Sequence, residues 1–423
     1  MTTTLINKIG RRIRVKRDAV HRFLTRPVAR QAVVNNFLKE FSYTHGLTRN
    51  LSHPSVYQIE TTNQCPYTCI MCPRTHAMTR QINHMNLGLF KSIVDQLRPA
   101  WQMETGDGEP LIRLLHYGEP MVYRHFTESI QHCHERGFNV YISTNPSSWT
   151  DRRIDEVLDL GLDEMTVMID GMDDATSIAI RGRAASFARG SANLLALAER
   201  KVARGLKKPW IQVAMVKQKH NAHQWRLFHD TWSNVEGIDD VYLGSFSTFD
   251  GDIDALNDLG KEAEQVDPKQ PEQVAHQEYL MQYPCYYPWH DVTVTAAGKV
   301  VPCCRDYNES LVLGDLTTQT LAEVWNGPKM RAFRREFKSG RLTSPLCRTC
   351  KEPSLEIGLP GRHYIVPRWL RKLGYGKFKV QPVEDDANAE PLTKPGFVSL
   401  TVSGNGLTEA TPRPERATQR KAA

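Results

Sequence analysis

The sequence predicts an α/β protein in which a partial (β/α)6 barrel, similar to an incomplete TIM barrel, precedes a small cysteine-rich domain made of a β-hairpin and a helix. Three observations predict this fold. Strand and helix patterns alternate six times between residues 55 and 250, closely spaced cysteines occur at both ends of this region, and the chain of 423 residues exceeds one ordinary domain. Alternating strands and helices indicate a parallel sheet. Six units are too few for a closed eight-stranded barrel.

Six apolar runs in this region are expected to be the strands, and amphipathic patterns between and after them are expected to be helices. The expected strands are residues 56–59, 111–116, 139–143, 164–169, 210–216 and 240–243, and the expected helices are residues 89–97, 123–136, 154–160, 192–203 and 222–232. Sites in such sheets lie at the carboxyl ends of the strands. We therefore expect the segments that follow these strands to share one rim.

Composition divides the chain further. We expect a basic segment at residues 1–50, the barrel at 51–250, a polar linker at 251–280, the cysteine-rich domain at 281–355 and a disordered tail at 376–423. No apolar run approaches the roughly 20 residues that span a bilayer, and charged residues interrupt the N-terminal apolar runs, unlike a signal peptide. The nine cysteines cluster at short spacings, which indicates metal binding in a reducing cytoplasm and not a disulfide framework.

The positive charge of the chain is concentrated at its start. The net charge is +7, and residues 1–50 alone carry eleven Lys or Arg and two acids, which leaves −2 for the remainder. A nearly neutral body excludes nucleic acid as a partner of the barrel. Residues 1–40 alternate apolar and basic groups, so they would contact an anionic membrane surface or an acidic partner. The alternative, which we favour, is a helix docked on the body with its basic face in water.

The stretch from Cys65 to Cys72 places three cysteines at C-x3-C-x2-C spacing, directly after the first expected strand. Thiolates are soft ligands that select zinc, copper(I) or iron–sulfur clusters. Iron–sulfur runs normally supply four cysteines, so three would leave one iron of a cubane cluster open to a substrate or cofactor. The motif alone also allows a zinc knuckle, with His76 as the fourth ligand, or three buried free thiols.

This motif resembles the signature of the radical S-adenosylmethionine (SAM) enzymes. In that family a 4Fe–4S cluster with an open iron binds SAM and cleaves it reductively to methionine and a 5′-deoxyadenosyl radical, which abstracts hydrogen from a substrate. The resemblance implies that Cys65, Cys69 and Cys72 are the cluster ligands and that the barrel is a radical SAM core. The family places an apolar or aromatic residue against the adenine, and Met71 stands here where Tyr or Phe is more usual. Methionine packs well on aromatic faces.

Three further segments on the expected rim are candidates for binding SAM. Gly118-Glu119-Pro120 resembles the Gly-Glu-Pro motif that holds the amino group of SAM, since glycine permits close backbone approach and oxygen atoms accept from an ammonium. Gly108-Glu109-Pro110 repeats the triplet but follows a polar stretch, so we expect a turn there. Asn145 follows the third strand. Arg181 would pair with the SAM carboxylate or form a surface salt bridge, and both roles stay open.

A second cysteine system begins at Cys285. Its spacing to Cys303 is C-x12-G-x4-C, residues 290–295 and 299–301 are expected to pair as strands around a turn, a helix is expected at 321–338, and Cys347-x2-Cys350 closes the set. This pattern resembles the SPASM or shorter twitch extension of radical SAM enzymes. The resemblance implies one auxiliary 4Fe–4S cluster on Cys285, Cys303, Cys347 and Cys350, with Cys304 as a spare that is hard to distinguish from Cys303. A zinc ribbon is the alternative.

The resemblance covers residues 55–355 and implies a cytoplasmic radical SAM oxidoreductase. A cluster with four thiolate ligands has no open iron, so it suits electron acceptance in a net oxidation. We therefore expect the dehydrogenation of a small polar metabolite such as a sugar or cyclitol, with a reductant such as flavodoxin or ferredoxin. The alternatives are maturation of a ribosomal peptide, redox-neutral epimerisation and, in another class, a non-catalytic metal-binding scaffold. Fold and motifs locate the radical chemistry but do not identify the substrate.

Overall fold

The computed structural model describes residues 27–102, 110–249, 253–266, 285–348 and 350 of one unit, and residues 401–403 and 406–408 of a second. The first unit contains a nine-stranded sheet in the order β6-β5-β4-β3-β2-β1-β7-β8-β9. Neighbouring strands from β1 to β6 are all parallel. These six strands are β1 (Val56–Ile59), β2 (Leu111–Arg113), β3 (Asn139–Thr144), β4 (Glu164–Met168), β5 (Trp210–Val216) and β6 (Asp240–Gly244).

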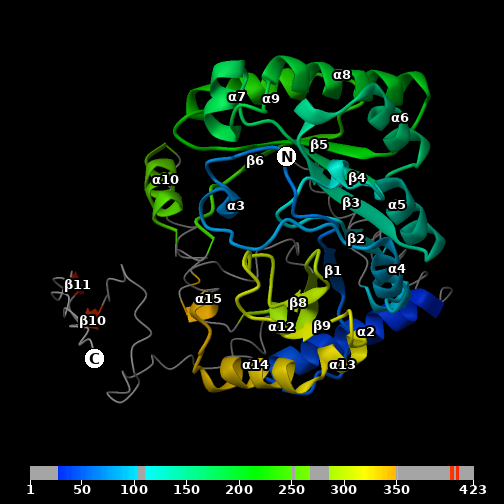
Figure 1. Ribbon diagram of the computed structural model, residues 1–423, viewed down its shortest axis with the longest axis vertical. Helices are drawn as coiled ribbons and strands as arrows, with labels where there is room; N and C mark the ends of the chain where they lie inside the picture. Colours follow the sequence, from blue (N-terminus) through cyan, green and yellow to red (C-terminus); the bar gives the residue numbers. More distant parts are fainter. Residues whose placement is uncertain are drawn as a thin grey trace, which may run out of the picture. The chain divides into compact units, whose positions relative to one another are not determined.

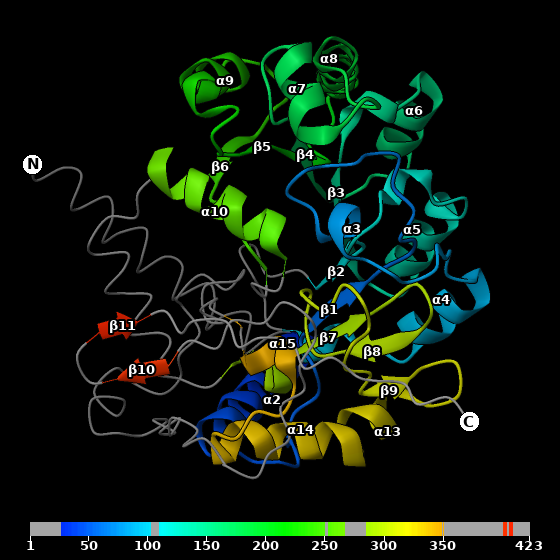
Figure 2. The ribbon, with the colours of Figure 1, turned by 60° about the vertical axis from the view of Figure 1, so that its left-hand side comes forward.

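Helices line the outer side of this curved sheet, and the loop that carries the short helix α3 lies inside the curve (Figures 1 and 2). Side-chain caps begin several of them: Asn86 caps α4, Thr150 caps α6 and Asp173 caps α7, as expected for residues that accept from unpaired helix N–H groups. The α-helices between β1 and β6 are α3 (Pro73–His76), α4 (Leu87–Asp95), α5 (Phe126–Glu135), α6 (Asp151–Asp159), α7 (Asp174–Arg181), α8 (Phe187–Ala203) and α9 (Trp225–Trp232).

The sequence predicted all six parallel strands, and the partial barrel is confirmed. The prediction succeeded because these strands are short runs rich in apolar residues, several of them fully buried, such as Ile142 and Val213, whereas the helices keep one exposed face. The helix α7 was missed. It is only eight residues long, too short for a clear helical period.

The cysteine-rich region continues the barrel sheet and shares its hydrophobic core. Strand β7 (Asp291–Val294) pairs in parallel with β1, with Val292 opposite Tyr57, and β8 (Lys299–Val301) and β9 (Gly314–Asp315) follow in antiparallel order. The predicted hairpin is thus present, with Gly298 in its turn at a φ of 78°. The remaining helices of this region are α12 (Tyr287–His290), α13 (Leu321–Trp325), α14 (Pro328–Ser339) and α15 (Pro345–Arg348).

Two expectations for this half of the chain need correction. The single helix expected at 321–338 is two helices, because Gly327 is extended and Pro328 starts a new helix. Within the expected linker, Asp254–Val266 forms α10, which buries Leu256 and Ala263; its sparse apolar residues fall on one face. Residues 267–280 lie outside the described residues.

The described part of the N-terminal segment is α2 (Pro27–Thr44), which packs against the body as expected. The side chain of Asn35 donates to the carbonyl oxygens of Trp101 (2.6 Å) and His53 (3.1 Å), and Lys39 donates to Ser55. Its exposed face is not basic, however, but carries large apolar side chains. Residues 1–26 lie outside the described residues. Among those that are described, no helix is both long and apolar enough to cross a bilayer.

The second unit, residues 382–423, was expected to be part of a disordered tail. Two of its segments, β10 (Thr401–Ser403) and β11 (Gly406–Thr408), pair as antiparallel strands, with Val402 opposite Leu407. Short β-branched and apolar residues favour such pairing. The rest of the expected tail lies outside the described residues.

Candidate functional site

The segments that follow β1 to β4 meet at the carboxyl rim of the sheet. The loop from Cys65 to Cys72 follows β1, Gly118-Glu119-Pro120 follows β2, Asn145 follows β3 and Asp170 follows β4. Hydrogen bonds join these segments to one another. The rim expected from parallel β/α units is therefore present.

The backbone of the Cys65–Cys72 loop is hydrogen-bonded to the end of α7. The amide N–H of Thr68 donates to the carbonyl of Arg181 (3.1 Å). The amide N–H of Ile70 donates to the carbonyl of Ile180 (2.8 Å). Gly182 has a φ of 84°, and a Cβ there would lie 2.0 Å from Oγ1 of Thr68. Only glycine allows this conformation and this approach without strain. The helix that the sequence did not reveal thus holds the cysteine loop in place.

The three thiols of the loop are half-buried. Burial, reinforced by the nearby Glu119 carboxylate, raises the pKa of Cys65 to about 12, and burial with the nearby Cys69 thiol raises that of Cys72 to about 11. Holding such thiols as thiolates requires a cationic centre. His76, the candidate fourth zinc ligand, donates from Nε2 to the carbonyl of Ile70 at 2.7 Å. In the described part of the chain, no three Cys, His, Asp or Glu side chains converge as the ligands of a single ion would.

Gly118 lies directly against the backbone that follows β1. A Cβ at this position would lie only 1.9 Å from the carbonyl oxygen of Thr62. The next residue, Glu119, donates its amide N–H to the carbonyl of Gln64 (2.9 Å), and Pro120 opens the short 3-10 helix Pro120–Val122. The Gly-Glu-Pro triplet therefore packs backbone to backbone on the start of the cysteine loop.

The carboxylate of Glu119 connects this triplet to the end of β3. It accepts hydrogen bonds from Oγ1 of Thr144 (2.6 Å), from the amide of Asn145 (2.9 Å) and from the amide of Met121 (3.1 Å). Burial raises the pKa of Glu119 to about 7, although the three donors oppose this shift. Two of the residues selected from the sequence, Glu119 and Asn145, are thus in direct contact.

Arg181 is buried and forms an ion pair with Asp170 at the end of β4. Its Nε and Nη2 atoms lie 2.7 Å and 2.5 Å from Oδ2 of Asp170, and its Nη1 lies 3.9 Å from Sγ of Cys69. Burial disfavours the charged guanidinium, but Asp170 and Cys69 outweigh burial and raise the pKa of Arg181. The surface salt bridge considered from the sequence is therefore wrong, because this pair is buried beside a thiol.

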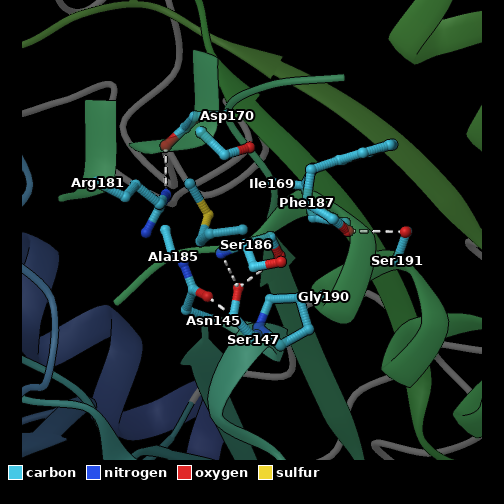
Figure 3. Close-up of a pocket in the computed structure, with 13 residues that line it drawn as sticks. Asn145, Ser147, Ile169, Asp170, Arg181, Ala185, Ser186, Phe187, Gly190 and Ser191 are labelled. Atoms are coloured by element: carbon cyan, nitrogen blue, oxygen red, sulfur yellow. Dashed lines mark hydrogen bonds and ion pairs between the residues drawn. The ribbon is translucent and has the colours of Figure 1, made fainter. Parts of the chain in front are cut away.

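Arg181 and Asn145 line the same pocket at the rim. Figure 3 shows Asp170 and Arg181 on one side of the pocket, with Asn145, Ser147 and Ser186 on the other. The pocket is lined by Asn145, Pro146, Ser147, Met168, Ile169, Asp170, Ser177, Arg181, Ala185, Ser186, Phe187, Gly190 and Ser191. Met71 is half-buried on the neighbouring cysteine loop. Of the second triplet, Gly108 and Glu109 lie outside the described residues.

Three other thiols of the C-terminal region lie near Cys303. Burial raises the pKa of Cys303, together with the thiols of Cys304, Cys285 and Cys347. The pKa of Cys347 is likewise raised by burial and by the thiols of Cys285 and Cys350. These thiols come from the segment before α12, the end of β8 and α15 with the residues after it, so only the fold brings them together.

Cys304 also has contacts outside this set. Its Sγ lies 3.6 Å from the hydroxyl of Tyr287, and its carbonyl oxygen accepts from the hydroxyl of Tyr117 (2.9 Å) and lies 3.1 Å from Nε2 of His116. Cys303, by contrast, lies near the thiols of Cys285 and Cys347.

The fully buried carboxylate of Glu60 joins the barrel to the cysteine-rich region, and sequence reasoning missed it. Arg80 binds it with two nitrogen atoms at 2.8 Å and 2.9 Å, the amide of Ala296 donates at 2.9 Å and the amide of Tyr117 at 3.2 Å, while Nδ1 of His116 lies 3.3 Å away. Burial disfavours ionisation, but His116 and Arg80 outweigh it and hold the pKa of Glu60 well below its usual value. An acidic residue directly after a buried strand was the available signal.

A second apolar cluster covers the cysteine loop near Cys72. Its buried members are Tyr117, Ile253, Leu256 and Tyr307, and partly buried Cys72, Ala77, Met78, Phe246, Phe249 and Leu259 pack against it. The cluster links the cysteine loop, the segment after β6 and α10 to the cysteine-rich region. Tyr117 is central, because the thiols of Cys304, Cys72 and Cys303 all lie near enough to add to the effect of burial in raising its pKa.

Two family models match the chain. The model of the radical SAM superfamily matches residues 59–207, and that of the SPASM iron–sulfur cluster-binding domain matches residues 285–351. The first range holds the cysteine loop and the rim residues, and the second holds the gathered C-terminal thiols. Both family resemblances drawn from the sequence are confirmed.

Curated relatives of two kinds are similar to the chain. The S-adenosyl-L-methionine-dependent 2-deoxy-scyllo-inosamine dehydrogenase of Niallia circulans is 22% identical over 315 residues, which are 71% of this chain and 94% of the relative. The PqqA peptide cyclase of Xanthomonas axonopodis pv. citri is 22% identical over 330 residues, which are 71% of this chain and 81% of the relative. Their names state that the first acts on 2-deoxy-scyllo-inosamine and the second on the PqqA peptide.

A solved structure shares the fold. The crystal structure of Streptococcus suis SuiB bound to the precursor peptide SuiA matches with a TM-score of 0.51 and 16% sequence identity, over 71% of this chain and 72% of that one. At this identity the similarity concerns the arrangement of the strands and helices.

Proposed function

The chain belongs to the radical SAM superfamily and carries a C-terminal SPASM domain, and from this premise we propose that it oxidises a hydroxyl group of a small polar metabolite, such as a sugar or cyclitol, to a ketone. As a radical SAM enzyme it uses 4Fe–4S clusters and SAM. Its bound cofactors supply the electron that cleaves SAM and accept the electron that an oxidation releases. The substrate and the direction of the redox change are the proposed part.

One observation carries the proposal: Cys303 lies near the thiols of Cys285 and Cys347, and Cys347 lies near that of Cys350. Cys285, Cys303, Cys347 and Cys350 would complete the ligands of one cubane cluster and leave no open iron, so this cluster would serve as an electron acceptor. The Niallia circulans relative, a dehydrogenase matched over 94% of its length, supports the same reaction type.

We assign the two clusters to separate thiol sets. Cys65, Cys69 and Cys72 would hold the cluster that binds SAM, because three thiols on one loop leave an iron free for the cofactor. Cys303 is assigned in place of Cys304, because Cys303 lies among the other auxiliary thiols. The all-thiol composition of both sets fits iron–sulfur clusters, and the buried, mutually close thiols would be stabilised as thiolates by iron.

The rim residues would orient SAM and keep water out. Gly118 and Glu119 would bring backbone oxygen atoms close to the amino group of SAM, and Met71 would pack against its adenine. Arg181 is committed to Asp170 through one edge, so only its Nη1 edge near Cys69 would reach the SAM carboxylate. The apolar cluster around Tyr117 would shield the space between the two thiol sets from water.

A peptide is the second candidate substrate. The PqqA peptide cyclase of Xanthomonas axonopodis pv. citri, matched over 330 residues, favours it. The same cofactors would then serve the modification of a ribosomal peptide. In either case the enzyme needs a one-electron reductant, for which we propose a flavodoxin or a ferredoxin.

The proposal is tested with anaerobically reconstituted enzyme, SAM and dithionite or a flavodoxin system. Cyclitols and amino-cyclitols labelled with deuterium at each carbinol position are supplied, and mass spectrometry follows 5′-deoxyadenosine and the product. We expect one deuterium in 5′-deoxyadenosine and a product two mass units lighter than the unlabelled substrate. A product with the mass of the unlabelled substrate, in which hydrogen has replaced the deuterium, would indicate epimerisation instead of oxidation. Turnover of a peptide and of no cyclitol would establish the second candidate.

A further inference from the structure

The helix α2 packs on the protein with its polar face and exposes its apolar face. Its buried residues include Asn35, Asn36, Lys39, Glu40 and Ser42, whereas Val33, Val34, Phe37 and Phe41 are 45%, 55%, 51% and 39% exposed. We call these four exposed residues the α2 ridge. Surface helices normally show the opposite arrangement, with the apolar stripe towards the core. Exposed contiguous apolar side chains mark sites of interaction.

Hydrogen bonds of the buried face fix this orientation. Asn35 donates to the carbonyl oxygens of Trp101 and His53 and accepts from the amide of His53 at 2.8 Å. Lys39 donates to Oγ of Ser55 at 2.8 Å, and the hydroxyl of Tyr286 lies 3.3 Å from Oε1 of Glu40. Rotating the helix to bury the ridge would leave these polar groups without their partners, at a considerable cost. The outward ridge is therefore a stable feature of the fold.

The ridge forms one continuous surface along the helix. Val33, Phe37 and Phe41 recur every four residues and so lie on one face, and the rings of Phe37 and Phe41 stack with centroids 6.3 Å apart. Figures 1 and 2 both show α2 at the outer edge of the first unit, on the side away from α7, α8 and α9. The ridge is thus separate from the rim that holds the cysteine loop.

The chain directly before the ridge is strongly basic. Residues 1–30 contain nine Lys or Arg and a single acid, Asp18, and their apolar residues Leu5, Ile6, Ile9 and Ile13 follow helical spacing. A bilayer with anionic headgroups provides both complements, an apolar layer for the ridge and negative charge for the basic residues. A second copy of the chain would instead bring two basic segments together, which mutual repulsion opposes.

We propose that the α2 ridge and the basic residues before it dock the enzyme on an anionic membrane surface. The ridge inserts Phe37 and Phe41 at the boundary between headgroups and acyl chains, and the basic segment binds the headgroups. A lipid-facing anchor needs two such signals, since a single apolar contact binds only weakly. This surface leaves the catalytic rim accessible, so the proposal is independent of the substrate.

The test is flotation of the full-length, cluster-loaded protein with vesicles of phosphatidylcholine alone or mixed with phosphatidylglycerol. We expect binding to the mixed vesicles only, weakened by salt. The variant Phe37→Ser/Phe41→Ser should bind about tenfold less, because it removes the apolar area that the bilayer would bury. The matched control, Leu227→Ser/Tyr242→Ser, removes apolar residues that are 58% and 54% exposed elsewhere, and should bind as the wild type does.

Three results would overturn the proposal. Equal binding of the ridge variant and the control would separate the ridge from the membrane. A concentration-dependent dimer in analytical ultracentrifugation that the ridge variant abolishes would assign the ridge to a second copy. An increase in hydrophobic-dye binding on deletion of residues 1–26, absent when Phe37 and Phe41 are also replaced, would show that the chain's own N-terminus covers the ridge. Iron content and SAM cleavage, which the ridge variant should leave unchanged, report on folding.

Discussion

The two thiol sets of this protein are built in different ways. Cys65, Cys69 and Cys72 belong to eight consecutive residues of one loop, and the barrel holds that loop through backbone hydrogen bonds to α7. The auxiliary thiols come from three separate segments of the cysteine-rich region. The three loop thiols are therefore close together in the sequence itself, whereas the auxiliary thiols come together only through the tertiary fold.

The charged surroundings of the two sets also differ. Two charged groups lie near the loop thiols: Arg181 is 3.9 Å from Sγ of Cys69, and the Glu119 carboxylate helps to raise the pKa of Cys65. The pKa values of Cys303 and Cys347 are raised chiefly by burial and by the neighbouring thiols. This difference fits the proposal that the first set serves a charged cofactor and the second holds a closed cluster.

The largest expected effect is the loss of SAM cleavage on changing the local set. The variant Cys69→Ala should form no detectable 5′-deoxyadenosine, and the triple variant at Cys65, Cys69 and Cys72 should lose about half of roughly eight irons. Liquid chromatography with mass spectrometry and iron analysis measure both. Cys133→Ala is the matched control, because this buried thiol of α5 belongs to neither set. Normal SAM cleavage by Cys69→Ala would refute the assignment.

The second largest effect is expected on changing the auxiliary thiols, and it should concern substrate turnover but not SAM cleavage. The variant Cys347→Ala/Cys350→Ala should still form 5′-deoxyadenosine but little oxidised product, because it removes the proposed electron acceptor. Cluster ligation also contributes to folding, so circular dichroism must first show a folded variant. Cys304→Ala is the control and should keep both clusters. Loss of auxiliary iron from Cys304→Ala, with none from Cys303→Ala, would reverse the assignment of the adjacent cysteines.

The contrast between the sets also explains what the sequence could predict. The loop motif, Gly118-Glu119-Pro120 and the six strands are local patterns, and the strand and helix periods could be read directly. The fold also keeps Glu119 and Asn145 in contact. The choice between Cys303 and Cys304 required the direction of two side chains, which depends on the path of the chain after β8.

Interactions between distant segments could not be predicted in the same way. Glu60 binds Arg80 and the amide of Ala296, and no spacing rule connects these positions. The helix α10 was missed because only its few apolar residues, such as Leu256, are buried. The sequence left Arg181 as a candidate surface residue, but its ion pair with Asp170 is buried. This burial also depends on how separate segments pack, which no local pattern reveals.

Glu60 provides a third test, because it joins the regions that hold the two sets. The variant Glu60→Gln should lower the free energy of unfolding by roughly 3–5 kcal/mol, since it removes the buried carboxylate that Arg80 binds with two nitrogen atoms and leaves Arg80 with Glu309, at 3.2 Å, as its counter-ion. Urea denaturation measures this loss. Glu156→Gln, which removes ion pairs of Arg152 and Arg153 on the surface of α6, should cost less than about 1 kcal/mol. Similar losses in both variants would show that the Glu60 network contributes little.

The contribution of Glu60 should also depend on pH. The fold holds its pKa below the usual 4.5, so the folded state favours the ionised form. The stabilisation is therefore present above pH 4.5 and is lost as the pH falls towards the lowered pKa. The difference in stability between wild type and Glu60→Gln should shrink as the pH falls below this value. A difference that is constant with pH would exclude the carboxylate charge as its source.

The smallest expected effect comes from replacing a glycine at the rim. It is compared with the replacement of a glycine elsewhere that should cost similar stability. In Gly118→Ala the new Cβ would meet the carbonyl oxygen of Thr62, only 1.9 Å away, and the backbone must shift at a cost of about 1–3 kcal/mol. Gly161→Ala should cost about 1–2 kcal/mol for a different reason, because Gly161 has a φ of 62° with open space around it.

The two variants thus lose similar stability, but only Gly118 lies beside the cysteine loop. We expect Gly118→Ala to raise the KM for SAM several-fold and Gly161→Ala to leave it unchanged. If both variants bind SAM normally, the close approach of Gly118 serves only the packing of β1 against β2, and the Gly-Glu-Pro triplet has no part in holding the cofactor.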